Sequence, residues 1–138
     1  MEAFAEYSHA IVAIALTALI GLAINPFAAI WKTSKGVTAG GPPNADYEDP
    51  AYRMDRAYQN LTEMMGIFTG VTAAAILAGA SPFWVNLFAS LFFVSRVAVA
   101  YVHVKGIGKP VQGPRTFIFV FGWACCIALA ILAIWAAF

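Results

Sequence analysis

The chain has 138 residues, of which 62% are hydrophobic and only 11% are charged, and its mean hydropathy is +0.77. Soluble domains usually carry about 25% charged residues, so this composition excludes a soluble globule and a disordered tail. The formal net charge is +1, which leaves no basic surface for binding nucleic acid.

Four apolar segments follow one another along the chain, at residues 9–31, 57–80, 83–104 and 117–138. Each has about 20 residues or more, which is enough for a helix to cross a hydrocarbon core of about 30 Å. The pattern predicts an all-α integral membrane protein with a four-transmembrane-helix bundle. We expect this bundle to form a single domain over residues 1–138.

The connections between these segments are unequal in length. Ser81 and Pro82 predict a tight turn between the second and third helices, whereas polar loops occupy residues 32–52 and 105–114. All eight basic residues lie in these two loops or toward them: Lys32, Lys35, Arg53, Arg56, Arg96, Lys105, Lys109 and Arg115. By the positive-inside rule, we expect the long loops to be cytoplasmic and both termini to be non-cytoplasmic.

Ionisable residues at membrane depth are candidates for function, and the second helix opens with several. Arg53, Arg56, Asn60 and Glu63 are spaced by three, four and three residues, so they fall within an arc of about 80°. Asp55 points away from this stripe. The alternative is that the stripe holds neighbouring helices together, because polar side chains also do this in membranes.

The third helix carries polar residues on a matching face. Arg96 and His103 are seven residues apart and share a face, whereas Tyr101 points about 140° away from Arg96. Arg96 and Glu63 have similar predicted depths, and an unpaired charge there would cost about 2.5–3.5 kcal/mol. We therefore predict an ion pair between Glu63 and Arg96, either within one chain or across a subunit boundary. His103 could instead be a hydrogen-bonded packing residue.

Cationic side chains are predicted to converge at the cytoplasmic side of the bundle. A cluster of fixed cations beside a low-dielectric region suits an anionic ligand or stabilises a thiolate. The alternative for single lysines is that they only anchor helix ends. The convergent set is Lys32, Arg53, Arg56, His103 and Arg115.

The rest of the sequence offers little chemistry. Cys125 and Cys126 are adjacent in an apolar segment and are too few for a closed zinc site, so we expect them to act as small apolar side chains. No His, Asp or Glu set has metal-ligand spacing, and we predict no metal site.

The segment that opens the second helix resembles the signature of a known superfamily. Its pattern is Arg53-x-x-Arg56-Ala57-x-x-Asn60-x-x-Glu63. It is similar to that of MAPEG proteins, the membrane-associated proteins of eicosanoid and glutathione metabolism. Further similarity lies in Lys32 to Val37 at the end of the first helix, in Arg96 followed by His103, and in Arg115-Thr116 at the start of the fourth helix.

The resemblance implies a homotrimer that binds glutathione between adjacent subunits near the cytoplasmic side. Arg56, Asn60 and Glu63 would contact the tripeptide, with Arg53 nearby, and Lys32 would meet a carboxylate. Arg115 would favour the thiolate, with Thr116 and His103 as helpers. Arg96 and Tyr101 complete the candidate binding residues. A lipophilic small molecule would reach this site from the bilayer, so the implied activity is that of a glutathione transferase or peroxidase.

Three positions depart from the family pattern. Lys32 stands where well-known members have arginine, and Gln59 replaces an arginine of the prostaglandin E synthase branch. His103 occupies the place of a tyrosine in the eicosanoid enzymes, although Tyr101 is near enough for an alignment slip. These departures argue against the eicosanoid activities. Two alternatives to catalysis are a membrane scaffold or accessory subunit, whose polar stripe only holds the oligomer together, and proton conduction through Glu63, Arg96 and His103.

Overall fold

The computed structural model describes residues 2–38, 40–108 and 113–138, and its regular structure is entirely helical. The described elements are α1 (Glu2–Ala5), α2 (Ser8–Ser34), α3 (Pro50–Leu77), α4 (Pro82–Lys105) and α5 (Pro114–Ala137). The helices α2 to α5 are each long and apolar enough to cross a membrane. The prediction of an all-α protein with four apolar spans is therefore confirmed, and each of α2 to α5 overlaps a predicted segment.

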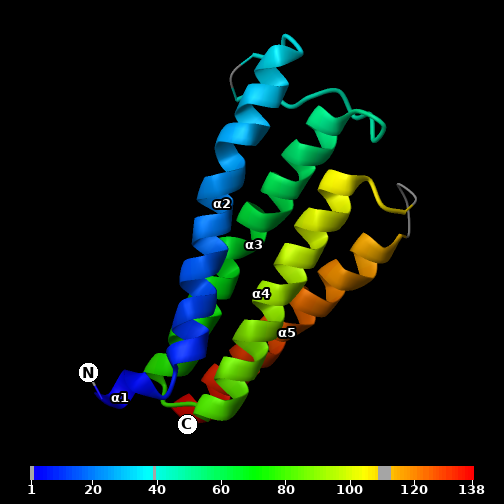
Figure 1. Ribbon diagram of the computed structural model, residues 1–138. Coiled ribbons are helices and arrows are strands. Elements are labelled where there is room, and N and C mark those ends of the chain that lie inside the picture. Colours follow the sequence, from blue (N-terminus) through cyan, green and yellow to red (C-terminus); the bar gives the residue numbers. More distant parts are fainter. Residues whose placement is uncertain (1, 39, 109–112) are drawn as a thin grey trace.

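The chain runs up and down, so its two ends meet at one end of the bundle. Both termini and the α3–α4 turn lie at that end, and the two longer connections lie at the other end (Figure 1). Of the eight basic residues predicted to lie in or toward the longer loops, Lys109 lies outside the described residues. Which end faces the cytoplasm stays a prediction.

Local sequence explains where the helices begin and end. Proline occupies the start of α3, α4 and α5, where its missing N–H has no helical partner to lose. Asp49 caps α3 by accepting a hydrogen bond from the backbone N–H of Ala51 at 3.0 Å. Gly106 ends α4 in the left-handed conformation, with φ at 65°, which favours glycine.

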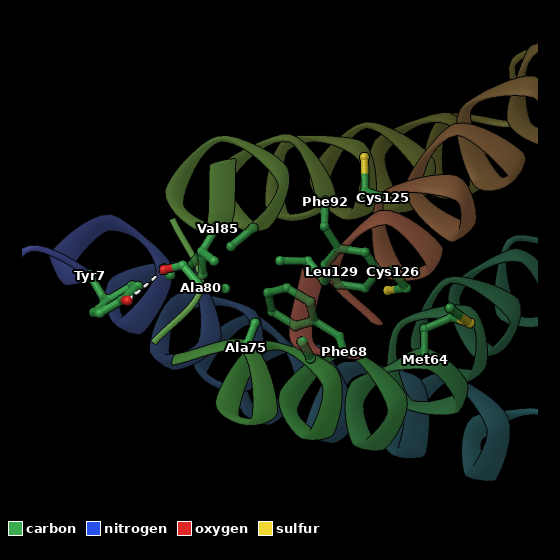
Figure 2. Packing of buried hydrophobic residues seen from close by; sticks show 14 residues of the cluster. Tyr7, Met64, Phe68, Ala75, Ala80, Val85, Phe92, Cys125, Cys126 and Leu129 are labelled. Atoms are coloured by element: carbon green, nitrogen blue, oxygen red, sulfur yellow. Dashed lines mark hydrogen bonds between the residues drawn. The ribbon is translucent and has the colours of Figure 1, made fainter. Parts of the chain in front are cut away.

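The core lies between α3, α4 and α5, with small residues of α2 packed on it. Phe68 of α3 and Phe92 of α4 stack with ring centroids 4.0 Å apart (Figure 2). Leu129, Cys125 and Cys126 of α5 fill the space beside them, and both cysteines are buried and free. They pack as small apolar side chains, as predicted. Close packing of this kind holds membrane helices together, because the hydrophobic effect does not favour association of helices that are already in lipid.

The outside of the bundle is apolar. Leu22 is 70% exposed, Leu77 is 77% exposed and Trp135 is 79% exposed. Soluble proteins rarely expose contiguous apolar surface on this scale, whereas lipid tails cover it without penalty. The protein is therefore an integral, multi-pass membrane protein.

Candidate functional site

A cavity of about 430 Å³ lies at the end of the bundle that carries the longer loops. It is enclosed by α3, α4, α5 and the loop before α3, whose positions can be followed in Figure 1. Five of the predicted site residues line it, from three different helices. The lining consists of Ala45, Tyr47, Tyr52, Arg56, Asn60, Val99, His103, Arg115, Thr116 and Phe119.

The α3 wall of the cavity is held by side-chain hydrogen bonds. Arg56 Nη1 donates to Gln59 Oε1 at 2.6 Å, and Asn60 Nδ2 donates to the backbone oxygen of Arg56 at 2.9 Å. Asn60 Nδ2 also donates to His103 Nε2 of α4 at 3.1 Å. The α3 stripe and the α4 face are thus joined at the level of the cavity.

His103 contacts Asn60 through one ring nitrogen and is only 6% exposed. An amide nitrogen can only donate, so Nε2 accepts and the ring proton of the neutral tautomer lies on Nδ1. His103 Nδ1 is buried and has no partner among the described residues. The ring therefore forms part of the cavity wall and fixes the Asn60 amide, which is a positioning role.

Arg115 begins the α5 wall and stacks on an aromatic ring from the loop. Its guanidinium carbon lies 4.4 Å from the centroid of Tyr47, a cation–π contact. Tyr47 in turn meets the His103 ring edge-on, with centroids 6.2 Å apart. Tyr47 is not predicted from the sequence, because a loop has no periodicity that orients its side chains. The one feature of the sequence that points to Tyr47 is that it is an aromatic residue in a polar loop, next to the predicted cation cluster.

Arg53 does not line the cavity, contrary to its predicted place in the convergent cation cluster. Its Nη1 donates to the backbone oxygens of Tyr47 and Glu48, each at 2.9 Å. Its guanidinium also lies against Gly106, where an added Cβ would meet Nε at 3.1 Å. Arg53 therefore ties the loop before α3 to the end of α4, and in this way it holds Tyr47 over the cavity.

Lys32 forms an ion pair with an acid on α3 and does not reach the cavity. Its Nζ lies 2.7 Å from Asp55 Oδ1, and it also donates to the backbone oxygen of Gly41 at 3.3 Å. Asp55 points away from the stripe, as predicted, but its partner was missed. One feature of the sequence could have indicated this partner. Asp55 is an acid on a buried face of its helix, and it lies at the same depth as Lys32, the one lysine in the last turn of the preceding helix. Both residues line a second cavity of about 350 Å³ between α2 and α3.

The predicted ion pair between Glu63 and Arg96 is not formed within the chain. Arg96 is 2% exposed, and its Nη2 donates to the backbone oxygen of Phe119 at 3.0 Å. The guanidinium also lies over the rings of Phe92 and Phe119, at 5.1 and 4.8 Å. Glu63 is exposed on the outside of α3. The prediction assumed that similar depth implies contact, whereas the two side chains point to different faces of the bundle.

The remaining predicted residues divide between the cavity and the outside. Thr116 lines the cavity next to Arg115, whereas Tyr101 is 58% exposed and does not line it. His103 therefore faces the site, and Tyr101 faces away. Arg96 is separated from the cavity by Phe119, whose ring covers it and whose backbone oxygen accepts its hydrogen bond.

The charge of the cavity is positive. Arg56 and Arg115 line it, and none of the described lining residues is acidic. Neither arginine forms an ion pair with a carboxylate in the described part of the chain. Two uncompensated guanidinium groups beside the partly buried Asn60 amide suit a small anion with carboxylate groups, because guanidinium binds carboxylate in a bidentate fork.

Comparison with known sequences gives the family of the chain. No curated protein matches it. The sequence model of the MAPEG family matches residues 7–135 of the 138, which includes α2 to α5 almost completely. The stripe of α3 and the arginine that opens α5 lie within this match. The chain therefore belongs to the MAPEG family.

Proposed function

We propose that the protein binds glutathione or a related thiol at the cavity between α3, α4 and α5, where the adjacent subunit that the family resemblance implies would complete the site. The thiol would then be conjugated to a lipophilic electrophile or used to reduce it. The observation that carries this proposal is that Arg56 and Arg115 line one cavity, none of whose described lining residues is acidic. Glutathione has two carboxylates and one ammonium group, so two arginines complement its net negative charge.

Different lining residues can bind the ligand and activate its thiol. Arg56 offers donors to a carboxylate, whereas Asn60 offers its amide oxygen to the ammonium group of the ligand, because both of its N–H donors bond to His103 and to the Arg56 backbone. Arg115, which is stacked on Tyr47, would lie beside the sulfur, where a fixed cation favours the thiolate. Thr116 supplies a hydroxyl donor next to it. In conjugation, the thiol proton leaves to solvent, the thiolate sulfur attacks an electrophilic carbon, and a carbon–sulfur bond forms as the bond from that carbon to its leaving group breaks. In reduction of a hydroperoxide, two thiols supply the electrons: the O–O bond breaks, and an alcohol, water and a disulfide form.

An apolar groove supports access for a lipophilic partner. A hollow of about 330 Å³ on the surface between α4 and α5 is lined mainly by Leu91, Val94, Phe117 and Phe121. Phe119, on the intervening turn of α5, lines the polar cavity. A lipophilic electrophile dissolved in the bilayer would meet apolar surface on the same two helices that carry His103 and Arg115.

We also infer that the protein self-associates through α3, as a homotrimer by resemblance to its family. The outward face of α3 continues the line of Arg56 with exposed small or polar residues, and an added Cβ at Gly66 or Gly70 would meet no atom of its own chain. A Gly-x-x-x-Gly face lets helices approach closely, and Glu63 on the same face needs a polar partner in lipid. These small or polar residues are Glu63, Gly66, Gly70 and Ala74, and the exposed Leu77 ends the same face.

A bulky residue on this face is expected to dissociate the oligomer. Gly70→Leu fills the open space beside α3, so we expect monomers by light scattering or native mass measurement in detergent. Ala124→Leu, which adds similar bulk at an exposed position of α5, is expected to leave the oligomer intact. A wild-type protein that is monomeric at every concentration, or a Gly70→Leu variant that still assembles, would contradict the inference.

Thermal unfolding with glutathione tests the binding site. A ligand at a hundredfold excess over its Kd stabilises the folded state by about 2.7 kcal/mol, which raises Tm by several degrees for a chain of this size. We expect this rise in detergent-purified protein with millimolar glutathione, and with S-methylglutathione as the thiol-free analogue. Arg56→Ala combined with Asn60→Ala is expected to remove the rise.

The control variant is Lys35→Met, because Lys35 is exposed and lies away from the cavity. It is expected to keep the full rise in Tm. If the rise survives in the double variant, the site is misplaced. If saturating glutathione leaves the wild-type Tm unchanged, the scaffold alternative replaces the proposed function.

A further inference from the structure

A continuous set of polar contacts crosses α3 from one cavity to the other. Lys32 Nζ pairs with Asp55 Oδ1 at 2.7 Å, and Asp55 Oδ2 accepts a hydrogen bond from Gln59 Nε2 at 2.7 Å. Gln59 Oε1 then accepts from Arg56 Nη1 at 2.6 Å. Lys32, Asp55 and Gln59 line the cavity beside α2, whereas Arg56 lines the cavity beside α4 and α5.

The chemistry of the neighbours dictates the orientation of Gln59. The Asp55 carboxylate can only accept hydrogen bonds, and the Arg56 guanidinium can only donate them. A glutamine between them satisfies both groups in one orientation, with its nitrogen toward Asp55 and its oxygen toward Arg56. Neither a glutamate nor an apolar side chain of this length would satisfy both neighbours.

This arrangement orients Arg56 without cancelling its charge. A carboxylate in direct contact with Arg56 would compete with an anionic ligand, whereas the Gln59 amide is neutral. The negative charge of Asp55 stays one side chain away, where Lys32 balances it. Asp55 is 1% exposed, so it needs such a partner. One Nη1 bond fixes the plane of the guanidinium, and its other donors remain for the cavity.

We propose that Asp55 and Gln59 are positioning residues that hold the Arg56 guanidinium toward the anionic ligand of the cavity. This inference rests on the proposed function, because it concerns the same site. A purely structural role for the Lys32–Asp55 pair, which ties α2 to α3, requires neither the Gln59 link nor any effect on ligand affinity.

A double-mutant cycle separates the two roles. Gln59→Met keeps the length of the side chain and leaves the Lys32–Asp55 pair in place. We expect it to weaken glutathione binding roughly tenfold, the effect of one hydrogen bond to a charged group, with the ligand-free Tm nearly unchanged. In an Arg56→Ala background, Gln59→Met is expected to have no further effect, because its influence passes through Arg56.

Two further variants test whether Gln59 and Asp55 act through Arg56. Gln59→Glu is expected to weaken binding more than Gln59→Met, because a carboxylate would neutralise Arg56 and repel Asp55. Asp55→Asn removes the obligate acceptor, so Gln59 can turn over, and we expect a smaller loss that also disappears in the Arg56→Ala background. Thr62→Val is the matched control on α3, since the exposed Thr62 hydroxyl donates to backbone oxygens of its own helix.

The affinities are measured by thermal shift and by calorimetry with glutathione, and in parallel with inorganic sulfate as a plain anion probe. If Gln59→Met binds like the wild type, or weakens binding equally with and without Arg56, the inference is overturned. If sulfate binding depends on Gln59 and Arg56 but glutathione does not bind, the proposed function fails and the inference stands. If neither anion binds the wild-type protein, both fail.

Discussion

Arg115→Ala is expected to reduce glutathione-dependent conversion of a lipophilic electrophile by about two orders of magnitude, the effect of removing one preorganised group that stabilises developing charge. Arg115 lines the cavity and is stacked on Tyr47 at 4.4 Å, so its guanidinium is held in one place. Conjugation of glutathione to chlorodinitrobenzene measures the rate. The ultraviolet absorbance of bound thiolate measures whether the sulfur remains ionised, and both signals should fall together.

Two variants separate charge from geometry in this prediction. Arg115→Lys keeps the positive charge but loses the planar stack on Tyr47, so an intermediate rate is expected. Lys105→Ala removes an exposed cation at the end of α4 and is expected to leave both signals unchanged. An Arg115→Ala variant that keeps its thiolate absorbance and its rate would remove Arg115 from the proposed chemistry.

Asp55→Ala is expected to destabilise the protein by about 3 kcal/mol, because removal of one partner from a buried ion pair leaves the other charge uncompensated. We place the effect at the low end of the range for such pairs, since the Lys32 side chain is 16% exposed and can turn toward solvent. The loss is measured as a fall in Tm, or by unfolding with increasing denaturing detergent. Lys32→Met combined with Asp55→Leu should recover much of it, because neither charge is then left alone.

The chain carries its own control for this prediction. Lys35 and Asp49 join the same two elements at 3.7 Å, but the Lys35 side chain is 59% exposed. Exposed pairs contribute about 1 kcal/mol or less, so Lys35→Met should change Tm very little. Equal effects of Asp55→Ala and Lys35→Met would show that burial does not strengthen the Lys32–Asp55 pair.

Helix periodicity predicted which residues share a face, and it was most reliable within one helix. Arg56 and Asn60 lie together on α3, as their spacing of four residues requires, and His103 rather than Tyr101 faces them from α4. The same spacing placed Arg53 and Glu63 on this face, but neither of them lines the cavity. Arg53 lies at the helix end and bonds to the loop, and Glu63 lies beyond the cavity on the exposed surface.

Contacts between helices were harder to predict, because depth and face do not determine which neighbour a side chain meets. Glu63 and Arg96 have similar depth, yet Arg96 turns toward α5. There Gly122 leaves room for its guanidinium and the backbone of Phe119 accepts its hydrogen bond. Lys32 meets the carboxylate of Asp55, a contact that the sequence did not predict.

The sequence by itself determined the membrane class, the four spans, the up-and-down order and the family. Composition, segment length and residue spacing are local properties, and they can be read from the chain without knowing how the helices pack. Only the tertiary structure decided which cations remain uncompensated. Arg56 and Arg115 face a cavity, whereas Lys32 is bound by Asp55, Lys35 lies near Asp49, Arg53 is bound by the loop backbone, and Lys105 is exposed to solvent. The reason is physical: an ion pair or a cation–π contact depends on the separation of two groups, and only the packed helices and the loop before α3 set that separation.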